Sequence, residues 1–148
     1  MAASSPEDRI ELLRRGFEAW DAGDIEAVLE LLDPDVEVVA ADGFINAGTH
    51  RGHDGFLRWA QQWFEAWEDF QQTPEAVVAV GDRHAVARFH QVGRGRGSGV
   101  EVEMVVGWTL EYRDGRFTYL ALHLGFEDAV RDARAREGIG DGERDDDD

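Results

Sequence analysis

Cysteine and lysine are both absent from the 148-residue sequence, and proline occurs only three times. Without cysteine, the chain can form neither a disulfide nor a thiolate zinc site. Without lysine, it carries neither a Schiff-base nucleophile nor the phosphate-binding lysine of a P-loop. The 15 basic residues, all arginine, face 32 acidic ones, giving a formal net charge of −17. This charge argues against a nucleic-acid partner, because phosphate binding needs a basic surface.

Long apolar runs are also missing, so we expect no membrane partner and a cytoplasmic location. The chain is 43% hydrophobic and holds five tryptophans and eight phenylalanines, enough for one buried core. We therefore expect a single domain over residues 1–139. Residues 137–148 contain seven acids and one arginine. Because such charges repel one another, we expect residues 140–148 to be a disordered acidic tail that can be deleted.

Hydrophobic spacing predicts helices over residues 7–21 and 54–69, and a shorter helix capped by Asp24. Residues 42–53 show no periodicity and are predicted to be a loop. The remaining predicted elements are strands over 36–40, 75–80, 84–92, 100–112 and 116–124, and a polar helix over 127–137. Helices followed by consecutive strands are typical of an α+β fold with an antiparallel sheet.

A glycine-rich stretch, GRGRGSGVEVEM, occupies residues 93–104. A phosphate-binding loop needs a strand before it and a helix after it, because the helix amides hold the phosphate. Here strands are predicted on both sides, and the glycine spacing matches neither G-x-G-x-x-G nor the P-loop. The stretch therefore predicts a hairpin whose arginines are solvated.

Several segments together resemble the SnoaL-like proteins, within the superfamily of nuclear transport factor two and ketosteroid isomerase. They are AWDAGDIEAVLELLDPDVEVV, THRG, a tryptophan-rich helix, the glycine-rich hairpin, GWTLEYRDGRF and LHLGFEDAVRDA. Their order and spacing carry the resemblance, which spans residues 8–139. It implies a cone-shaped α+β fold, in which a curved antiparallel sheet wraps around three N-terminal helices. It also implies an apolar pocket at the open end of the cone and a homodimer formed through the convex sheet face.

This fold hosts cyclases, isomerases, hydrolases and binding proteins, so function depends on individual residues. Ketosteroid isomerases use a tyrosine of the first helix and two aspartates on strands. The matching positions here hold Gly16, Ala40 and Trp108, so these groups are absent. Asp42 follows Ala40 by two residues and could act as a shifted base. SnoaL-like cyclases use an aspartate on the last strand with a nearby histidine, and this strand offers only His123.

The candidate catalytic residues are therefore His123, His90 and Asp42. Strand alternation puts His123 and Tyr119 on one face, which we expect to point into the cone. The alternative is that Leu120, Leu122 and Leu124 line the cone, with His123 on the outer face. Either histidine could equally be a structural sheet residue or lie at a dimer interface.

The expected pocket lining is Phe17, Trp20, Ala40, Trp63, Met104, Trp108 and Tyr119. We expect no metal, because His50 and His53 offer only a pair of loop ligands with no clear third, and no cofactor. His84 is expected to be an exposed turn residue. Two functions remain open: a protein that binds a small apolar molecule, and an acid/base enzyme acting on a polyketide-like or steroid-like substrate. The missing family acids favour binding.

Overall fold

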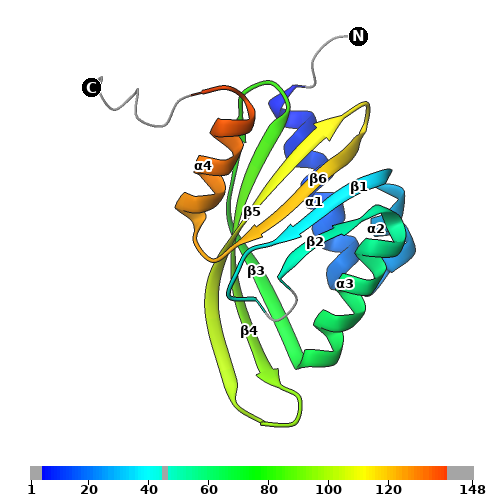
Figure 1. Cartoon of the computed structure of the whole chain (residues 1–148), viewed down its shortest axis with the longest axis vertical. Helices are drawn as coiled ribbons and strands as arrows, with labels where there is room; N and C mark the ends of the chain where they lie inside the picture. The colour runs from blue at the N-terminus through cyan, green and yellow to red at the C-terminus, as the bar shows by residue number, and fades with distance from the viewer. Residues whose placement is uncertain (1–4, 45–46, 140–148) are drawn as a thin grey trace.

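One strongly curved six-stranded sheet, in the order β2-β1-β6-β5-β4-β3, organises the molecule (Figure 1). The computed structural model describes residues 5–44 and 47–139. Its elements are α1 (Pro6–Asp21), α2 (Ile25–Glu30), β1 (Leu32–Ala40), β2 (Gly48–Arg51), α3 (Gly52–Ala66), β3 (Trp67–Val80), β4 (His84–Gly95), β5 (Glu101–Arg113), β6 (Arg116–His123) and α4 (Phe126–Arg136). The predicted cone-shaped α+β architecture is confirmed. The residues of the expected tail, 140–148, lie outside the described part.

The sequence had suggested an entirely antiparallel sheet, and this expectation was wrong for one pair of strands. Strands β1 and β6 pair in parallel, with Val38 opposite Leu120. The other strand pairs of the sheet are antiparallel. A parallel pair needs a long connection between its strands, and the whole segment from β2 to β5 supplies it here. Consecutive strands in the sequence could not reveal this pairing.

Two boundaries differ from the prediction around α3. Residues 48–51 form β2, where Thr49 pairs with Val39, although a loop was expected. Helix α3 ends at Ala66 rather than at residue 69, and Trp67 already belongs to β3. Pairing with a distant strand determines both the formation of β2 and the end of α3. Local hydrophobic spacing cannot predict such pairing.

The glycine-rich stretch forms the β4–β5 hairpin, as predicted, but Arg96 within it is not simply solvated. Its guanidinium donates hydrogen bonds to the carbonyls of Phe64, Glu65 and Trp67, at 3.0, 3.1 and 2.7 Å. These carbonyls lie at the C-terminal end of α3, where backbone acceptors lack partners within the helix and a positive charge is favourable. The hairpin therefore fixes the point at which the helix ends.

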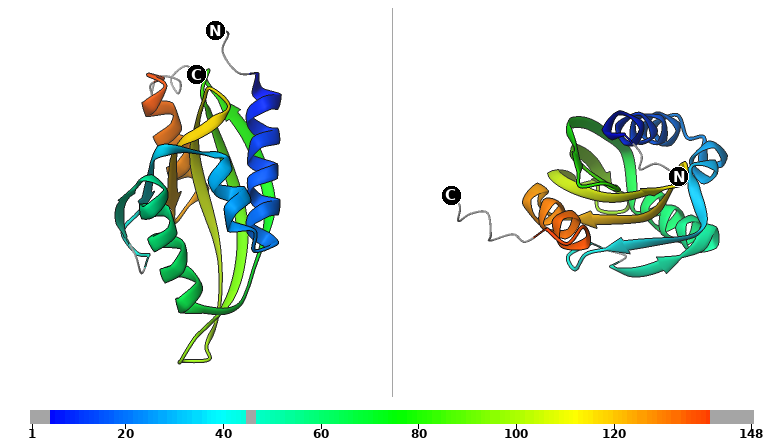
Figure 2. Two further views of the ribbon diagram at one scale, coloured as in Figure 1. Left: turned by 90° about the vertical axis from the view of Figure 1, so that its right-hand side faces the viewer. Right: turned by 90° about the horizontal axis from the view of Figure 1, so that it is seen from above.

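The two faces of the sheet are covered differently (Figure 2). Helices α1, α2 and α3 bury the main core against the concave face, whereas α4 packs on the convex face around Val86. Gly107 of β5 permits this close approach, because a Cβ there would lie 2.9 Å from the Cβ of Ala129. Thr109 donates a hydrogen bond to the carbonyl of Ala129 at 2.8 Å. Within the described residues, no helix is long and apolar enough to cross a bilayer.

The β3–β4 turn is held from both sides of the sheet. Buried Arg9 of α1 donates to the carbonyls of Val80, Gly81 and His84. From the end of α4, the Glu137 carboxylate accepts hydrogen bonds from the Arg83 amide and from His84 Nδ1, at 2.8 and 2.5 Å. His84 itself is completely buried, so the expectation of an exposed turn residue was wrong.

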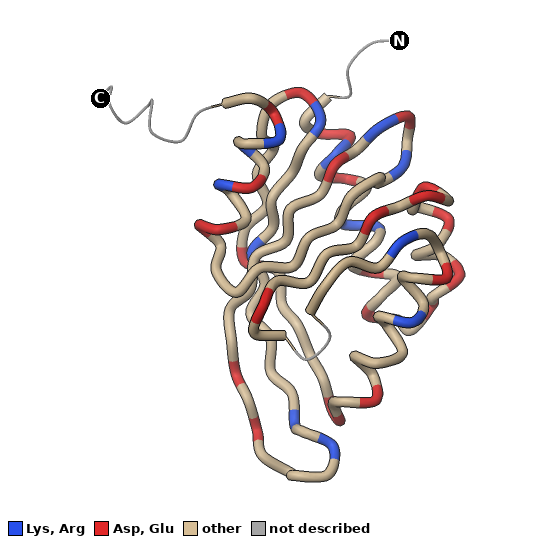
Figure 3. The backbone as a smooth tube through the Cα atoms, in the orientation of Figure 1, with Lys and Arg blue, Asp and Glu red and all other residues tan. Residues whose placement is uncertain are grey.

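Charged residues elsewhere are spread over helices, turns and strand ends, with acidic positions in the majority (Figure 3). One group of charged and polar side chains on the convex face is centred on Glu111. The Glu111 carboxylate contacts Arg83, Arg113 and Thr118. Burial alone would raise the pKa of Glu111, but the hydrogen bonds from Thr118, Arg113 and Arg83 lower it to about 2. The ionised carboxylate is therefore a stabilising part of the folded state.

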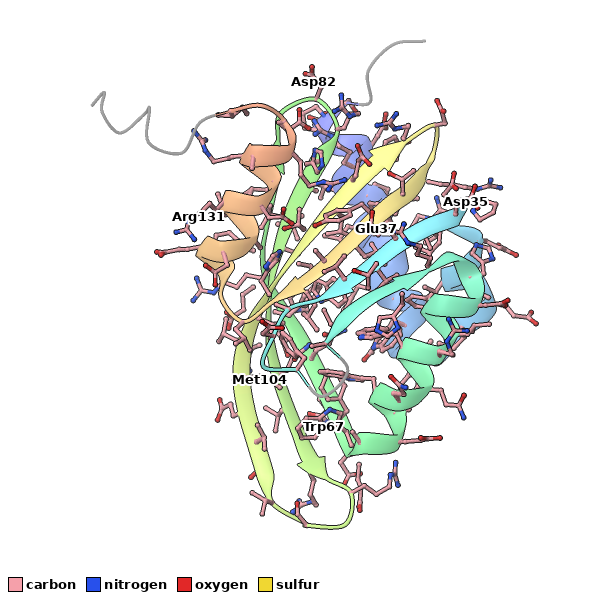
Figure 4. The ribbon with its side chains drawn as sticks, viewed as in Figure 1. Asp35, Glu37, Trp67, Asp82, Met104 and Arg131 are labelled. Atoms are coloured by element: carbon pink, nitrogen blue, oxygen red, sulfur yellow. The ribbon has the colours of Figure 1, made fainter. Side chains whose placement is uncertain are left out.

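We expect Glu137→Ala to lower the free energy of unfolding by about 2–4 kcal/mol, because buried donors of the β3–β4 turn would lose their acceptor. Asp82, labelled in Figure 4, lies in this turn next to the end of α4, and its amide also donates to Glu137. Urea unfolding followed by circular dichroism measures the change. Deletion of residues 140–148 is the control, because it leaves Glu137 in place, and should shift the melting temperature by only a few degrees. Equal stability of Glu137→Ala and the unmodified chain would contradict the role of this carboxylate.

Glu111→Gln should lower stability by about 2 kcal/mol at pH 7, because the neutral amide loses the charge-assisted contacts. The pKa of Glu111 is depressed in the folded state, so its contribution is complete above the usual pKa of 4.5 and is lost as the pH falls toward 2. The stability difference between the two proteins should accordingly shrink below about pH 4.5. Exposed Glu30→Gln provides the comparison in the same unfolding series. A difference that stays constant across this pH range would refute the assignment.

Candidate functional site

A cavity of about 100 Å³ lies between the concave face of the sheet and the helices that cover it. Helices α1, α2 and α3 form its walls on one side, and strands β3 to β6 with the first residue of β1 form the other. Its lining residues are Leu13, Gly16, Phe17, Trp20, Val28, Leu31, Leu32, Phe56, Trp59, Trp63, Phe70, Gln72, Phe89, Gln91, Trp108, Leu110, Phe117, Leu120 and Leu122. The cavity is therefore almost entirely aromatic and aliphatic.

Aromatic rings form a connected group around Trp59 of α3. Its ring lies 5.7 Å from that of Trp20 on α1, 5.9 Å from Trp63 and 5.8 Å from Trp108 on β5. The Trp59 and Trp108 rings meet edge to face, at 85°. Such contacts are favourable because the positive edge of one ring meets the negative face of the other. They join α1 and α3 to the sheet and form one wall of the cavity.

Two glutamines supply the polar side chains of the cavity lining that the structure describes. Gln72 of β3 and Gln91 of β4 occupy paired positions in neighbouring strands. The Nε2 of Gln91 donates a hydrogen bond to Oε1 of Gln72 at 3.0 Å. Gln91 is 2% exposed, whereas Gln72 is half-buried. The polar part of the cavity therefore lies on the concave face of β3 and β4.

Four of the expected pocket residues line this cavity: Phe17, Trp20, Trp63 and Trp108. Two others occupy the core without lining it. Ala40 is buried in β1. Met104 of β5, which is labelled in Figure 4, packs against the main core.

Tyr119 and His123 lie on the convex face, so the expected orientation of both side chains was wrong. Leu120 and Leu122 line the cavity instead. Alternation along β6 places odd and even residues on opposite faces, and a one-residue difference in register exchanges them. Distant pairing with β1 and β5 decides which set points inward. His123 therefore cannot act on a molecule bound in the cavity.

These two residues meet α4 through Asp132. The Asp132 carboxylate accepts hydrogen bonds from the Tyr119 hydroxyl, at 2.7 Å, and from His123 Nε2, at 3.2 Å. Burial alone would raise the pKa of Asp132, but the hydrogen bonds from His123 and Tyr119 lower it. Burial and the neighbouring Asp132 raise the pKa of Tyr119 above its usual value. The guanidinium of Arg136 stacks over the Tyr119 ring at 3.4 Å. This polar group attaches α4 to the sheet.

The other candidate catalytic residues also lie away from the cavity. His90 is on the convex face of β4, where its Nε2 contacts the Glu103 carboxylate of β5 at 2.5 Å. Asp42 is exposed after the end of β1. His53 contacts the carbonyl of Leu32 at 3.0 Å. Among the described residues, no group of three or more His, Asp or Glu side chains could hold a metal ion.

Sequence reasoning did not identify Gln72 and Gln91 as parts of the site. A signal was present, because a glutamine in a strand that otherwise alternates toward the core is unusual. Gln91 follows Phe89 with period two, so both point to the same face. Assigning that face to the cavity required the tertiary structure.

Several solved structures share this fold. An NTF2-like protein of unknown function from Burkholderia pseudomallei K96243 superposes with a TM-score of 0.73 at 20% identity, covering 84% of this chain and 95% of that protein. A protein from Sinorhizobium meliloti, proposed to be a polyketide cyclase, gives 0.63 at 25% identity, covering 76% and 94%. A protein with a ketosteroid isomerase-like fold from Catenulispora acidiphila DSM 44928, in complex with trimethylamine, gives 0.67 at 17% identity, covering 88% and 94%.

The sequence comparison is more specific than the structural one. No curated protein matches this chain in sequence. The SnoaL-like domain family, however, matches residues 13–120. This segment runs from α1 to β6 and contains every residue that lines the cavity except Leu122. The cone, its aromatic cavity and this match agree, and the chain belongs to the SnoaL-like domain family.

Proposed function

We propose that this protein binds a small, largely apolar molecule in the cavity on the concave face of the sheet. The observation that carries the proposal is the composition of the cavity wall. Aromatic and aliphatic side chains surround the space, and two paired glutamines supply a local polar group. Ligand sites typically combine such an apolar lining with a few polar groups that orient the ligand.

The size of the cavity limits the ligand. Pockets for drug-sized molecules enclose about 300–1,000 Å³, whereas an engineered apolar cavity of about 150 Å³ binds benzene. The cavity here measures about 100 Å³. A molecule with a single ring matches that scale. A multi-ring steroid or polyketide would require the half-buried side chains Phe17, Trp20 and Phe70 to move apart.

An acid/base enzyme is the second candidate, and the similarity to the Sinorhizobium meliloti protein favours it. General acid/base catalysis requires an ionisable group within hydrogen-bond distance of the reacting atoms. None of the described residues that line the cavity is acidic, basic or a histidine. Binding without acid/base chemistry is therefore the function that the cavity supports better.

Toluene, a single-ring apolar probe, should bind and change the intrinsic fluorescence, because Trp20, Trp59, Trp63 and Trp108 line the cavity. Gly16→Leu should weaken this binding at least about tenfold, because the added side chain would occupy cavity volume from α1. The same change should not lower helix stability, since leucine favours helices by about 1 kcal/mol over glycine. Ala135→Leu, at an exposed position of α4, is the matched control.

Toluene binding that is equal in the unmodified chain and in Gly16→Leu would place the ligand outside the cavity. Failure of toluene and other single-ring hydrocarbons to bind at all would overturn the proposal. Thermal unfolding of each variant establishes that the comparison is made between folded proteins.

We also propose that the chain forms a homodimer through the part of the convex face that α4 leaves uncovered. Val78, Val105 and Leu124 are exposed there, at 41, 38 and 51%. Arg88, which pairs with Glu75, and Glu103, which contacts His90, give this face both signs of charge. A two-fold axis could set such a face against its own copy, with opposite charges opposed.

Light scattering at micromolar protein concentration and moderate salt should therefore give the mass of a dimer. Val105→Asp should shift the mass toward that of the monomer, because it places an unpaired charge in the apolar part of the interface. Leu57→Asp, on the exposed side of α3, should leave the dimer intact. A monomeric mass for the unmodified chain would contradict the proposal.

A further inference from the structure

The paired glutamines of the cavity are an exception in an apolar wall. Register places Gln72 opposite Gln91, and Gln91 opposite Met104 of β5. Phe89 lies on the same face of β4 and is stacked against Phe17 of α1, at 5.3 Å. A leucine or methionine at position 91 would suit these neighbours. The polar side chain is therefore not explained by packing.

The amide of Gln91 is only half satisfied. Its Nε2 donates to Gln72, but within the described part of the protein its Oε1 has no hydrogen-bond partner. The side chain is 2% exposed and lines the cavity. A buried acceptor without a donor is unfavourable, because it has lost its contacts with water and gained none in return. A molecule in the cavity can supply the missing donor.

The surroundings restrict the chemistry of that donor. No cavity-lining residue among those described carries a charge, so a charged ligand would be buried without a counter-ion. A carboxylate would in addition place a second acceptor beside Gln91 Oε1. A neutral hydroxyl satisfies the acceptor at the smallest cost of desolvation. The aromatic wall and the volume of about 100 Å³ suit a single ring as the body of the molecule.

We infer that the cavity selects a single-ring molecule that carries a hydroxyl group, which donates a hydrogen bond to Oε1 of Gln91. This inference rests on the proposed binding function and adds the chemical class of the ligand. Gln91 is the specificity-determining residue. Gln72 is a positioning residue. Its Oε1 accepts the hydrogen bond from Gln91 Nε2, and this contact directs the Oε1 of Gln91 away from Gln72.

Three single-ring probes test the inference: phenol and toluene, which are nearly equal in shape, and anisole, which is larger than phenol by a methyl group. Phenol can donate a hydrogen bond, anisole can only accept one, and toluene can do neither. Titration calorimetry of the full chain should rank phenol at least about tenfold above the other two, the advantage of one additional buried hydrogen bond. Gln91→Leu should remove this preference while retaining affinity for toluene. Gln61→Leu, at an exposed position of α3, should leave all three affinities unchanged.

Equal affinities of phenol and toluene for the unmodified chain would overturn the inference but leave the proposed function intact. Anisole binding as tightly as phenol would also overturn it, because the group contacting the ligand would then not be an acceptor. Failure of all three probes to bind would overturn the proposed function as well. If Gln91→Leu does not fold, Gln91→Met serves in its place, and the ranking on the unmodified chain decides by itself.

Discussion

The contact of Trp59 with Trp20 and Trp108 is the interaction on which the rest of the structure depends. It joins α1 and α3 to the concave face of the sheet through rings 5.7 and 5.8 Å apart. Indole rings are large and rigid, so a group of them maintains its separation once packed. The same contacts that bury the core therefore also keep the cavity open beside it.

Strand alternation separates two chemical environments across one sheet. Leu120 and Leu122 of β6 face the cavity, while Tyr119 and His123 face α4 and Asp132. Most of the titratable network lies on the convex side, where it attaches α4 and the β3–β4 turn. The concave side is left with a neutral wall. This separation explains why the cavity is suited to binding a neutral molecule and not to proton transfer.

The stability of the convex side comes from carboxylates that accept several hydrogen bonds. Glu137 receives donors from the β3–β4 turn, and Glu111 receives them from Thr118, Arg113 and Arg83. Each carboxylate is buried enough to need these contacts and is satisfied by them. Because these groups belong to the scaffold, acid should weaken the fold without altering the groups that line the cavity.

The sequence by itself determined the fold class, the family and the position of the main helices. Hydrophobic spacing is a local property, so Phe17, Trp20 and Trp63 could be placed on core-facing sides of α1 and α3 and do line the cavity. Only the tertiary structure decided the inward face of β6, the parallel pairing of β1 with β6 and the burial of His84. Each depends on contacts between residues far apart in the chain. A shift of one residue in strand register exchanges the two faces, and for that reason His123 was expected in the cavity while Gln91 was overlooked.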